Sequence, residues 1–596
     1  MCGILGVISN NKNAVKIINE GIRQLQNRGY DSFGVSYFKQ NNIKTIKQAS
    51  IEKRDSITFV MKQIQNETIY NIISHTRWAT HGPKNNVNSH PHNSINNKFS
   101  LVHNGIIENY LELKQFLSDN NVRCISDTDS EIIVNLISYY YNLTNNIQDS
   151  IHKTTLLLKG SWALLILCDD NTENIYAICN GSPLLLGFNN NLVIFSSEVS
   201  GFNNYINKYI VIKENELIIV KKDINRVVIN NLDTYTIKKK LNIIDSFDIP
   251  KPYTFWLEKE INDQYLYTKQ LKNLLLNKIH SILKNHTNEL KLINNIVLLG
   301  CGTSYHAAMM GKHYLKKIDL FYNVQSINAS NFDINDIPKI GSTAVIVLSQ
   351  SGETKDLLGC LDILPRNIYT IAIINSAEST IARKCDLILN LDVGREISVA
   401  STKSFTAQII FLQIITTYYK YIYSNNNKLW SIQTLDLDIK NTLDIASSEI
   451  NKYISSLISP SMFILGKGKY FTIARESALK IKEITYIHAE GYSGSSLKHG
   501  PYSLIKEYFP VILFIMNDEH MNMMMNCYNQ VISRKAFTLV ITNISHLDVI
   551  NKIVIPSNQS EIHSTIILQY VSYLIGNKLK LAIDRPRNLA KCVTTH

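Results

Sequence analysis

The sequence lacks the close cysteine spacings that hold a metal or a disulfide framework. Its 596 residues include nine cysteines, and no two of them form a C-x-x-C pair. Structural zinc sites use such pairs, and small secreted domains space an even number of cysteines closely. The odd, widely spaced set therefore predicts neither a metal site nor a disulfide scaffold. It is typical of a reduced, cytoplasmic protein.

Export and membrane signals are also missing. No basic segment followed by an apolar run precedes Cys2, so we expect no secretory leader. The most apolar helical stretch, 407–423, is interrupted by Gln408, Gln413 and Lys420. We therefore expect no membrane span and no membrane partner.

The charge pattern gives no sign of a nucleic-acid partner. Charged residues make up only 18% of the chain, and the net charge of +12 comes from scattered basic residues. No basic helix carries interleaved aromatic residues, so we expect no nucleic acid. A positive field also suits an anionic substrate. Hydrophobic residues reach 45%, which is enough for several buried cores.

Among the residues that are present, Cys2 is the most informative. Met1 is normally removed when the next side chain is small, so Cys2 is expected to become the first residue. It then carries both a thiol, with a pKa of about 8.5, and a free α-amine, with a pKa of about 8. The amine can accept the thiol proton, which makes Cys2 a candidate nucleophile. The alternative is an arbitrary small residue at a frayed end, and the first three residues alone do not decide.

The order of apolar segments predicts two different architectures. Up to about residue 225, short apolar strands alternate with helical segments, which indicates stacked sheets flanked by helices. The second half contains a diverged internal repeat, and each copy has the strand and helix order of a doubly wound parallel sheet. The repeated strands are 296–302 and 462–468, 343–348 and 511–516, and 370–375 and 538–543.

A hydroxyl-rich turn, 349–354, joins the buried strand 343–348 to a helix that starts at Lys355. Exposed amides, the helix dipole and short hydroxyl groups converge at such a turn, which suits a phosphate. Helix capping is the alternative. The second copy has 517–520, Asn-Asp-Glu-His, at the equivalent turn, which favours the phosphate interpretation. No Walker lysine is present and 300–304 lacks a third glycine, so no nucleotide cofactor is expected.

Three further sets of residues are candidates for catalysis, but their sequence patterns are less specific. Lys480 and Glu483 lie three residues apart on one predicted helix and share a face, as surface ion pairs also do. His499 lies in a Ser/Gly-rich loop, where it could titrate near neutrality. Lys591 lies close to the end of the chain, where a lysine is usually solvated.

Taken together, these stretches resemble the glutamine–fructose-6-phosphate aminotransferase (isomerizing) family, the glucosamine-6-phosphate synthases. The matching motifs follow one another in order along nearly the whole chain. They are residues 1–4, 27–32, 75–82, 90–92, 103–109, 127–129, 301–304, 349–354, 399–403, 480–490, 497–501 and 586–591.

The resemblance implies an α/β multidomain fold. An N-terminal-nucleophile αββα glutaminase domain is followed by two doubly wound α/β sugar isomerase (SIS) domains. The expected boundaries are 2–218 for the glutamine amidotransferase type-2 domain, 219–286 for a linker, 287–424 for the phosphate-binding first SIS domain, 451–586 for the second SIS domain and 587–596 for a C-terminal catalytic tail.

The resemblance also implies the reaction: fructose 6-phosphate and L-glutamine yield glucosamine 6-phosphate, the first step towards UDP-N-acetylglucosamine. The implied catalytic residues are Cys2, Asn104, Gly105, Lys480, Glu483, His499 and Lys591. The implied glutamine-binding residues are Arg77, Trp78, Thr80, His81 and Asp129. The implied sugar-phosphate-binding residues are Ser304, Ser349, Gln350, Ser351, Thr354, Val399 and Ser401. No metal and no cofactor are implied.

Individual roles follow from the same resemblance. Asn104 and the Gly105 amide match an oxyanion hole. Arg77 matches the group that holds the glutamine α-carboxylate, and Asp129 matches the one that holds its α-amine. Trp78 matches the gate of an ammonia channel. Lys591 matches a Schiff-base lysine, and Glu483 matches the carboxylate that moves a proton between C1 and C2. His499 matches a ring-opening acid or base that the neighbouring subunit donates, so a homodimer is implied.

Some positions depart from the family pattern, and other functions stay open. Ser495 and Ser496 replace the usual Gly-Glu, and Ser398 replaces a glycine, which puts the rate and the pH optimum in doubt more than the reaction. The alternatives are a sugar-phosphate deaminase or isomerase, or a sugar-phosphate sensor, with a vestigial glutaminase domain. The complete sets of matching residues in both halves argue against them.

Overall fold

The computed structural model describes residues 2–10, 14–50, 55–78, 82–223, 226–239, 249–423 and 434–591. The chain divides into two compact units, the first ending at Asp248 and the second running from Ile249 to Lys591. Among the described residues, no helix combines the length and the apolar character of a membrane span.

The first unit contains two antiparallel sheets. The eight-stranded sheet has the order β14-β11-β9-β10-β1-β4-β2-β3, and the six-stranded sheet has the order β13-β12-β8-β7-β6-β5. The strands of the larger sheet are β1 (Gly3–Ser9), β2 (Ser32–Lys39), β3 (Asn42–Ala49), β4 (Asn71–Arg77), β9 (Leu185–Asn189), β10 (Leu192–Ser196), β11 (Lys208–Val211) and β14 (Lys238–Lys239). Those of the smaller sheet are β5 (His92–Asn93), β6 (Phe99–Ile107), β7 (Gly160–Cys168), β8 (Asn174–Asn180), β12 (Ile218–Lys222) and β13 (Val227–Ile229).

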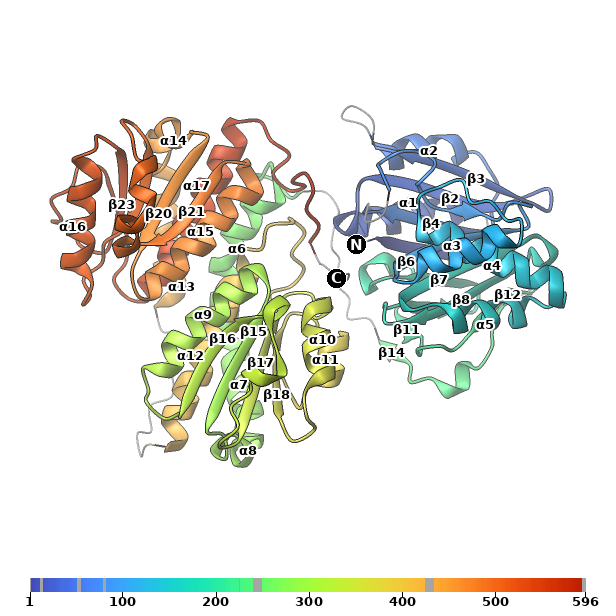
Figure 1. The fold of residues 1–596 in the computed structure, drawn as a ribbon, viewed down its shortest axis with the longest axis horizontal. Helices are drawn as coiled ribbons and strands as arrows, with labels where there is room; N and C mark the ends of the chain where they lie inside the picture. Colours follow the sequence, from blue (N-terminus) through green and yellow to red (C-terminus); the bar gives the residue numbers. More distant parts are fainter. Residues whose placement is uncertain are drawn as a thin grey trace. The chain divides into compact units, whose positions relative to one another are not determined.

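The two sheets stack between two layers of helices (Figure 1). On β1, Ile4 and Ile8 face the core between the sheets, while Leu5 and Val7 face the helices, because successive strand residues point to opposite faces. The helices are α1 (Ala14–Gln24) and α2 (Ser56–Ile64) on the larger sheet, and α3 (Tyr110–Asp119), α4 (Asp129–Thr144) and α5 (Ile147–Leu157) on the smaller one. The predicted αββα arrangement is confirmed.

The predicted linker 219–286 is divided between the two units. Its first part continues the sheets of the first unit: β12 pairs with β8, β13 with β12, and β14 with β11. Its last part forms α6 (Trp256–Gln270), a π-helical turn (Leu271–Leu275) and α7 (Leu276–Asn285), whose apolar residues are buried in the core of the second unit. The boundary between the two units therefore lies inside the predicted linker, at Asp248 and Ile249.

The second unit contains two parallel five-stranded sheets with equivalent strand orders, β16-β15-β17-β18-β19 and β21-β20-β22-β23-β24. This equivalence confirms the internal repeat. The strands of the first sheet are β15 (Asn295–Gly300), β16 (Asn323–Asn328), β17 (Thr343–Ser349), β18 (Tyr369–Ile374) and β19 (Leu387–Asn390). Those of the second are β20 (Ser461–Gly466), β21 (His488–Ser493), β22 (Pro510–Phe514), β23 (Phe537–Thr542) and β24 (Lys552–Val554).

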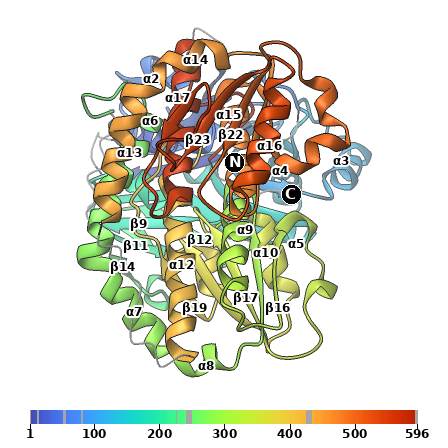
Figure 2. The same cartoon turned by 90° about the vertical axis from the view of Figure 1, so that its left-hand side faces the viewer.

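Helices cover both faces of each parallel sheet, as the almost continuously apolar strands require. On the first sheet, α9 (Gly302–Lys316) and α12 (Lys403–Tyr423) lie opposite α10 (Lys355–Ile363) and α11 (Thr380–Lys384) (Figure 1). On the second, α15 (Lys469–Thr485) and α17 (Ser560–Lys578) lie opposite α16 (Met521–Ile532) (Figure 2). One apolar cluster, to which α8 (Thr287–Lys291), α13 (Leu435–Glu449) and α14 (Asn451–Leu457) also contribute, joins the two sheets into one body.

Candidate active sites

The pairing of β1 with β4 places Cys2 beside the end of the motif that contains Arg77. Gly3 lies opposite Thr76 in this pair. Trp78 therefore donates its backbone N–H to the Cys2 Sγ atom at 3.3 Å, and its carbonyl oxygen lies 3.6 Å from the same sulfur. Two segments that are distant in sequence meet at one thiol, as the resemblance implies.

Opposing effects act on the Cys2 thiol. Loss of surrounding water raises the pKa of Cys2, while the Trp78 amide and the positive charges of Arg77 and Arg28 lower it. Arg28 also donates to the Cys2 carbonyl oxygen at 3.0 Å, which fixes the backbone. Burial is the larger effect, so the pKa of Cys2 is raised overall, and the polar neighbours act against it in favour of the thiolate, which is the nucleophilic form.

Asn104 and Gly105 lie on β6, next to Cys2. The Asn104 Nδ2 atom donates to the Cys2 carbonyl oxygen at 3.0 Å and to the Ser197 hydroxyl at 2.9 Å. Gly105 has a φ of 136°, and a Cβ at this position would lie 2.0 Å from the Ser161 carbonyl oxygen, so only glycine fits. The Asn104 side-chain amide is therefore fixed between the Cys2 carbonyl and Ser197.

Asp129 is the first residue of α4 and is buried beside Arg77. Its Oδ2 atom accepts the backbone N–H of Ile107 at 2.9 Å. Burial lowers the pKa of Arg77, whereas the negative charges of Cys2, Asp31 and Asp129 raise it. A buried guanidinium and a buried carboxylate near one another suit a ligand that carries both charges. Thr80 and His81 lie outside the described residues.

Sequence reasoning assigned no role to a buried histidine cluster, which consists of His75, His90, His92 and His103. The rings of His75 and His90 lie 4.0 Å apart, and those of His90 and His92 lie 4.8 Å apart. Burial lowers the pKa of His75 to about 3 and places the pKa values of His90 and His92 well below 6.5. These three rings are therefore neutral at physiological pH.

Ser130 connects this cluster to the glutamine-binding candidates. Its hydroxyl lies 2.8 Å from His90 Nε2 and 2.9 Å from His103 Nδ1. His103 directly precedes Asn104, and Ser130 directly follows Asp129. The histidines in motifs 75–82, 90–92 and 103–109 were the available signal, but their meeting point on α4 depends on the fold.

In the second unit, the predicted phosphate turn lies at the carboxyl end of β17, where the strand order reverses. Ligands of doubly wound sheets bind at this point. The Ser349 hydroxyl accepts the Gly352 N–H at 3.0 Å and lies 2.9 Å from the Thr354 hydroxyl. Gly352 has a φ of 68°, and a Cβ there would lie 2.0 Å from the Ser379 Oγ atom. The Thr354 side chain, at the N-cap position of α10, makes no capping hydrogen bond to the helix.

Two other sugar-site candidates line the same edge of this sheet. Ser304, in the first turn of α9, accepts a hydrogen bond from Gln408 at 3.0 Å. Val399 is buried in the segment after β19, and its N–H donates to the Asp584 carbonyl oxygen at 3.2 Å. Parallel strands bring the ends of β15, β17 and β19 to one edge. Gln350 and Ser351 lie in the same turn as Ser349.

Lys591 is held inside this edge by two groups. Its Nζ atom lies 2.6 Å from Glu396 Oε2 and 3.2 Å from the Ser401 hydroxyl. The side chain of Lys591 is 4% exposed and that of Glu396 is fully buried. Lys591 is thus an enclosed amine, whereas a lysine near the end of a chain is usually solvated. Glu396 was not predicted from the sequence.

Lys480 and Glu483 join the site from α15. The Lys480 Nζ atom lies 2.5 Å from Glu483 and 2.9 Å from the Thr303 hydroxyl. Glu476, also missed by sequence reasoning, lies 3.6 Å from Lys480 and 2.7 Å from His306. Burial alone would lower the pKa of Lys480, but Glu483 and Glu476 raise it. The second SIS domain therefore supplies charged groups to the first.

The contacts of Lys591 with Glu396 and Ser401 do not involve His499. It ends a short 3₁₀ segment, Gly494–His499, and its side chain is exposed. Its predicted role stays a prediction.

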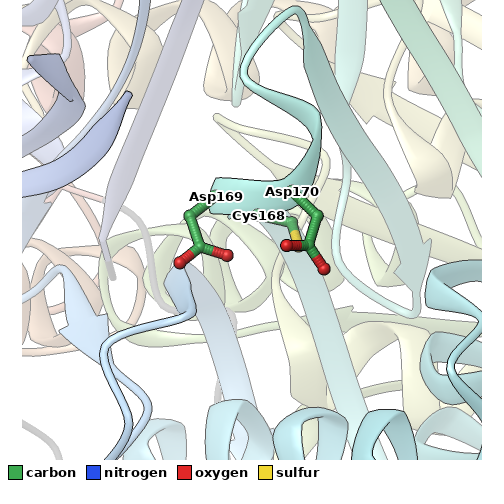
Figure 3. A group of neighbouring side chains, drawn as sticks. All are labelled: Cys168, Asp169 and Asp170. Carbon is green, nitrogen blue, oxygen red and sulfur yellow. The ribbon is translucent and has the colours of Figure 1, made fainter. Parts of the chain in front are cut away.

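One group of side chains among the described residues has the spacing of metal ligands, namely Cys168, Asp169 and Asp170 (Figure 3). Asp170 already accepts the Tyr141 hydroxyl at 2.5 Å and pairs with Lys98 at 2.9 Å. Burial raises the pKa of the Cys168 thiol to about 12. A protonated thiol and a carboxylate with two partners are poor ligands, so we assign no metal to this group.

Two domain families match the chain. The SIS domain family matches residues 289–418 and 458–575, and the glutamine amidotransferase domain family matches residues 75–204. The two SIS ranges each enclose one parallel sheet of the second unit, and the amidotransferase range lies within the first unit.

Several curated relatives match over their full length. A protein of Acanthamoeba polyphaga mimivirus, named "Probable glutamine--fructose-6-phosphate aminotransferase [isomerizing]", is 36% identical. Proteins of Clostridium tetani and Bacillus subtilis, named "Glutamine--fructose-6-phosphate aminotransferase [isomerizing]", are each 33% identical. Each of these alignments covers 100% of both chains.

A solved structure is similar to part of the chain. It is the C-terminal domain of glucosamine-fructose-6-phosphate aminotransferase from Francisella tularensis, with 27% identity and a TM-score of 0.51. The match covers 57% of this chain and 100% of that one.

Proposed function

The chain belongs to the family of glutamine–fructose-6-phosphate aminotransferases (isomerizing), and we propose on this basis that it makes glucosamine 6-phosphate from L-glutamine and fructose 6-phosphate. The observation that carries the proposal is the presence of two nucleophiles of different chemistry, Cys2 in the first unit and Lys591 in the second. A thiol suits attack on an amide, and an amine suits a Schiff base with a ketone.

In the first unit, the Cys2 thiolate attacks the side-chain amide of glutamine. Arg77 holds the α-carboxylate and Asp129 holds the α-amine, and their burial side by side supports these roles. Asn104 and the Gly105 N–H stabilise the oxyanion, for which each donor contributes about 3 kcal/mol. Ammonia leaves, and water then hydrolyses the thioester to glutamate.

In the second unit, Ser349, Gln350, Ser351 and Thr354 hold the sugar phosphate at the N-terminus of α10, with Ser304, Val399 and Ser401 lining the site. The several hydroxyl groups of this turn and the helix dipole support this role. Lys591 forms a Schiff base with the C2 ketone, and ammonia then replaces the lysine nitrogen. Glu483, paired with Lys480, moves a proton from C1 to C2, which converts the ketose into a 2-amino aldose.

Ammonia must travel from Cys2 to the sugar without meeting water, because protonation removes its electron pair. Trp78 is the proposed gate of this route, and the contacts of its backbone with Cys2 Sγ support a link between the gate and the thiol. Glutamine hydrolysis is then useful only when the sugar site is filled.

The protein acts as a homodimer in this proposal. His499 opens the sugar ring from the neighbouring subunit, and its exposure within its own chain supports a role towards a second copy. We also propose that the protein works in the cytoplasm. The eight cysteines in the described part of the chain form no disulfide with one another, which supports a reducing compartment.

One assay tests the proposed reaction. The purified full-length protein is incubated with L-glutamine and fructose 6-phosphate, and glutamate and glucosamine 6-phosphate are quantified. We expect equal amounts of the two products. Glutamate without amino sugar contradicts the proposal. Deamination or isomerisation of a sugar phosphate without use of glutamine favours the alternative with a vestigial glutaminase.

A further inference from the structure

Lys591 is paired with a carboxylate that is itself held as an anion. Glu396 Oε1 accepts the backbone N–H groups of Thr402 at 2.9 Å and Ser404 at 3.2 Å. Glu396 Oε2 accepts the Ser404 hydroxyl at 2.8 Å in addition to Lys591. Burial raises the pKa of Glu396, but Lys591 and these donors hold it down to about 2. Carboxylates with several donors keep their charge even when buried.

The other charged groups around this pair do not replace Glu396. On α6, Glu260 accepts the backbone N–H groups of Ile397 and Ser398, and burial together with the Glu396 charge raises the pKa of Glu260 to about 8. Glu260 is therefore neutral at pH 7. Lys403 on α12 faces Asp263 at 3.8 Å, and Lys480 on α15 faces Glu483 and Glu476. Among the described residues, Glu396 is the anion that contacts Lys591.

We propose that Glu396 stores Lys591 as an ammonium ion and thereby sets the pH above which this lysine attacks the sugar ketone. The inference rests on the proposed Schiff-base role of Lys591. Glu396 is a positioning residue in this proposal, because it acts on the sugar only through the lysine.

The chemistry explains why the protonation state matters. An ammonium nitrogen has no electron pair to donate, so Lys591 must first release one proton to solvent. The electron pair of the resulting amine forms the bond to the ketone carbon. The ketone oxygen then leaves as water with the two remaining nitrogen hydrogens, and a C=N imine remains. A lysine stored as an ammonium ion is also protected from other carbonyl compounds.

The Glu396→Gln variant separates charge from shape. The glutamine Oε1 atom still accepts the Thr402 and Ser404 N–H groups, but no negative charge faces Lys591. An enclosed amine without a counter-charge favours its neutral form. The Glu396→Asp variant does the opposite, since it keeps the charge and changes the length. We therefore expect the pH above which Lys591 attacks the ketone to fall in Glu396→Gln and to stay unchanged in Glu396→Asp.

The experiment measures imine formation at Lys591 against pH. Full-length protein receives fructose 6-phosphate without glutamine, a cyanoborohydride pulse reduces the imine, and mass spectrometry quantifies the labelled Lys591 peptide. We expect the midpoint pH of labelling to fall by at least one unit in Glu396→Gln, with at least tenfold more label at pH 7. Glu396→Asp should keep the midpoint of the unmodified protein.

Controls separate this inference from the proposed function. Lys591→Arg should give no label. Thermal unfolding checks that each variant is folded. If Glu396→Gln does not fold, Glu396→Ala is the second neutral variant, with the same expected direction. A midpoint that stays or rises in the neutral variants overturns the inference while leaving the Schiff base in place. Absence of label at Lys591 in the unmodified protein at every pH overturns both.

Discussion

The two nucleophiles differ in what surrounds them. The Cys2 thiol faces the Trp78 amide and the charges of Arg77 and Arg28, all of which favour an anion. Lys591 faces the carboxylate of Glu396 and the Ser401 hydroxyl, which favour a cation. Burial nevertheless raises the pKa of the Cys2 thiol, so these charges only reduce the effect of burial, whereas the carboxylate beside Lys591 stabilises a cation. The comparison teaches that the sign of the neighbouring charge favours the reactive form of one nucleophile and the unreactive form of the other.

The largest expected effect comes from removing one nucleophile while keeping its charge. Lys591→Arg retains a cation beside Glu396 but cannot form an imine, so glucosamine 6-phosphate formation should fall by about 10⁴-fold or more. Alkylation of Cys2 by iodoacetamide should be unchanged. The reciprocal control, Cys2→Ser, should abolish glutamate formation and keep the imine at Lys591. Amino sugar formation at full rate by Lys591→Arg would show that the second site works without an amine.

A smaller loss is expected from the group that acts after the imine has formed. Glu483→Gln removes the proposed proton carrier and should lower the rate of amino sugar formation by about 10²–10⁴-fold. Labelling of Lys591 by cyanoborohydride should persist. The control is Lys482→Met, which changes an exposed residue on the same helix. Equal rates for the two variants would remove Glu483 from the mechanism.

The support of the Cys2 thiolate can be weakened directly. The Arg28 charge lowers the pKa of Cys2, so Arg28→Met should raise that pKa and shift alkylation of Cys2 to higher pH. At neutral pH we expect slower alkylation, because a smaller fraction of the thiol is ionised. Arg23→Met on α1 is the control, because Arg23 contacts Asn19 and Thr58 instead. A profile that does not move would mean that Arg28 acts on the backbone alone.

The smallest expected effect concerns the histidine cluster. Ser130→Ala removes the hydroxyl between His90 and His103 and should raise the KM for glutamine about fivefold, since a hydrogen bond contributes about 1 kcal/mol. The kcat of glutamine hydrolysis should change less, because no reacting atom is removed. Ser138→Ala on the same helix, whose hydroxyl contacts Asn96, is the control. A lower kcat with an unchanged KM would assign Ser130 to the chemistry instead.

Features built from contiguous residues were predictable from the sequence. The two doubly wound sheets and the hydroxyl-rich turn at 349–354 each follow from a strand, a turn and a helix in succession. The join between the units was placed less well, because β12 crosses the predicted boundary at 218 and α6 belongs to the following core. Proline and charge mark where a chain leaves a fold, but they do not show which strands have already paired.

Residues whose partners come from distant segments were not predictable. Glu396, Glu476 and Ser130 look like ordinary polar residues in the sequence. Their roles depend on contacts that only the fold creates. Glu396 contacts Lys591, Glu476 on α15 contacts α9, and Ser130 on α4 contacts β6. Cys2 was a candidate nucleophile from its place in the sequence, and the role of Asn104 was implied by the resemblance, whereas their contact depends on the register of β1.

The capping of α6 has a consequence for how the second unit can be handled. Asp584 accepts the N–H groups of Trp256 and Leu257 at 2.8 Å each, so a carboxylate from the end of the unit closes its first long helix. A unit whose beginning and end are tied together tolerates excision and circular permutation. Residues 249–591 should therefore be expressible as a separate fragment, and a short peptide that joins its ends should leave Lys591 in place.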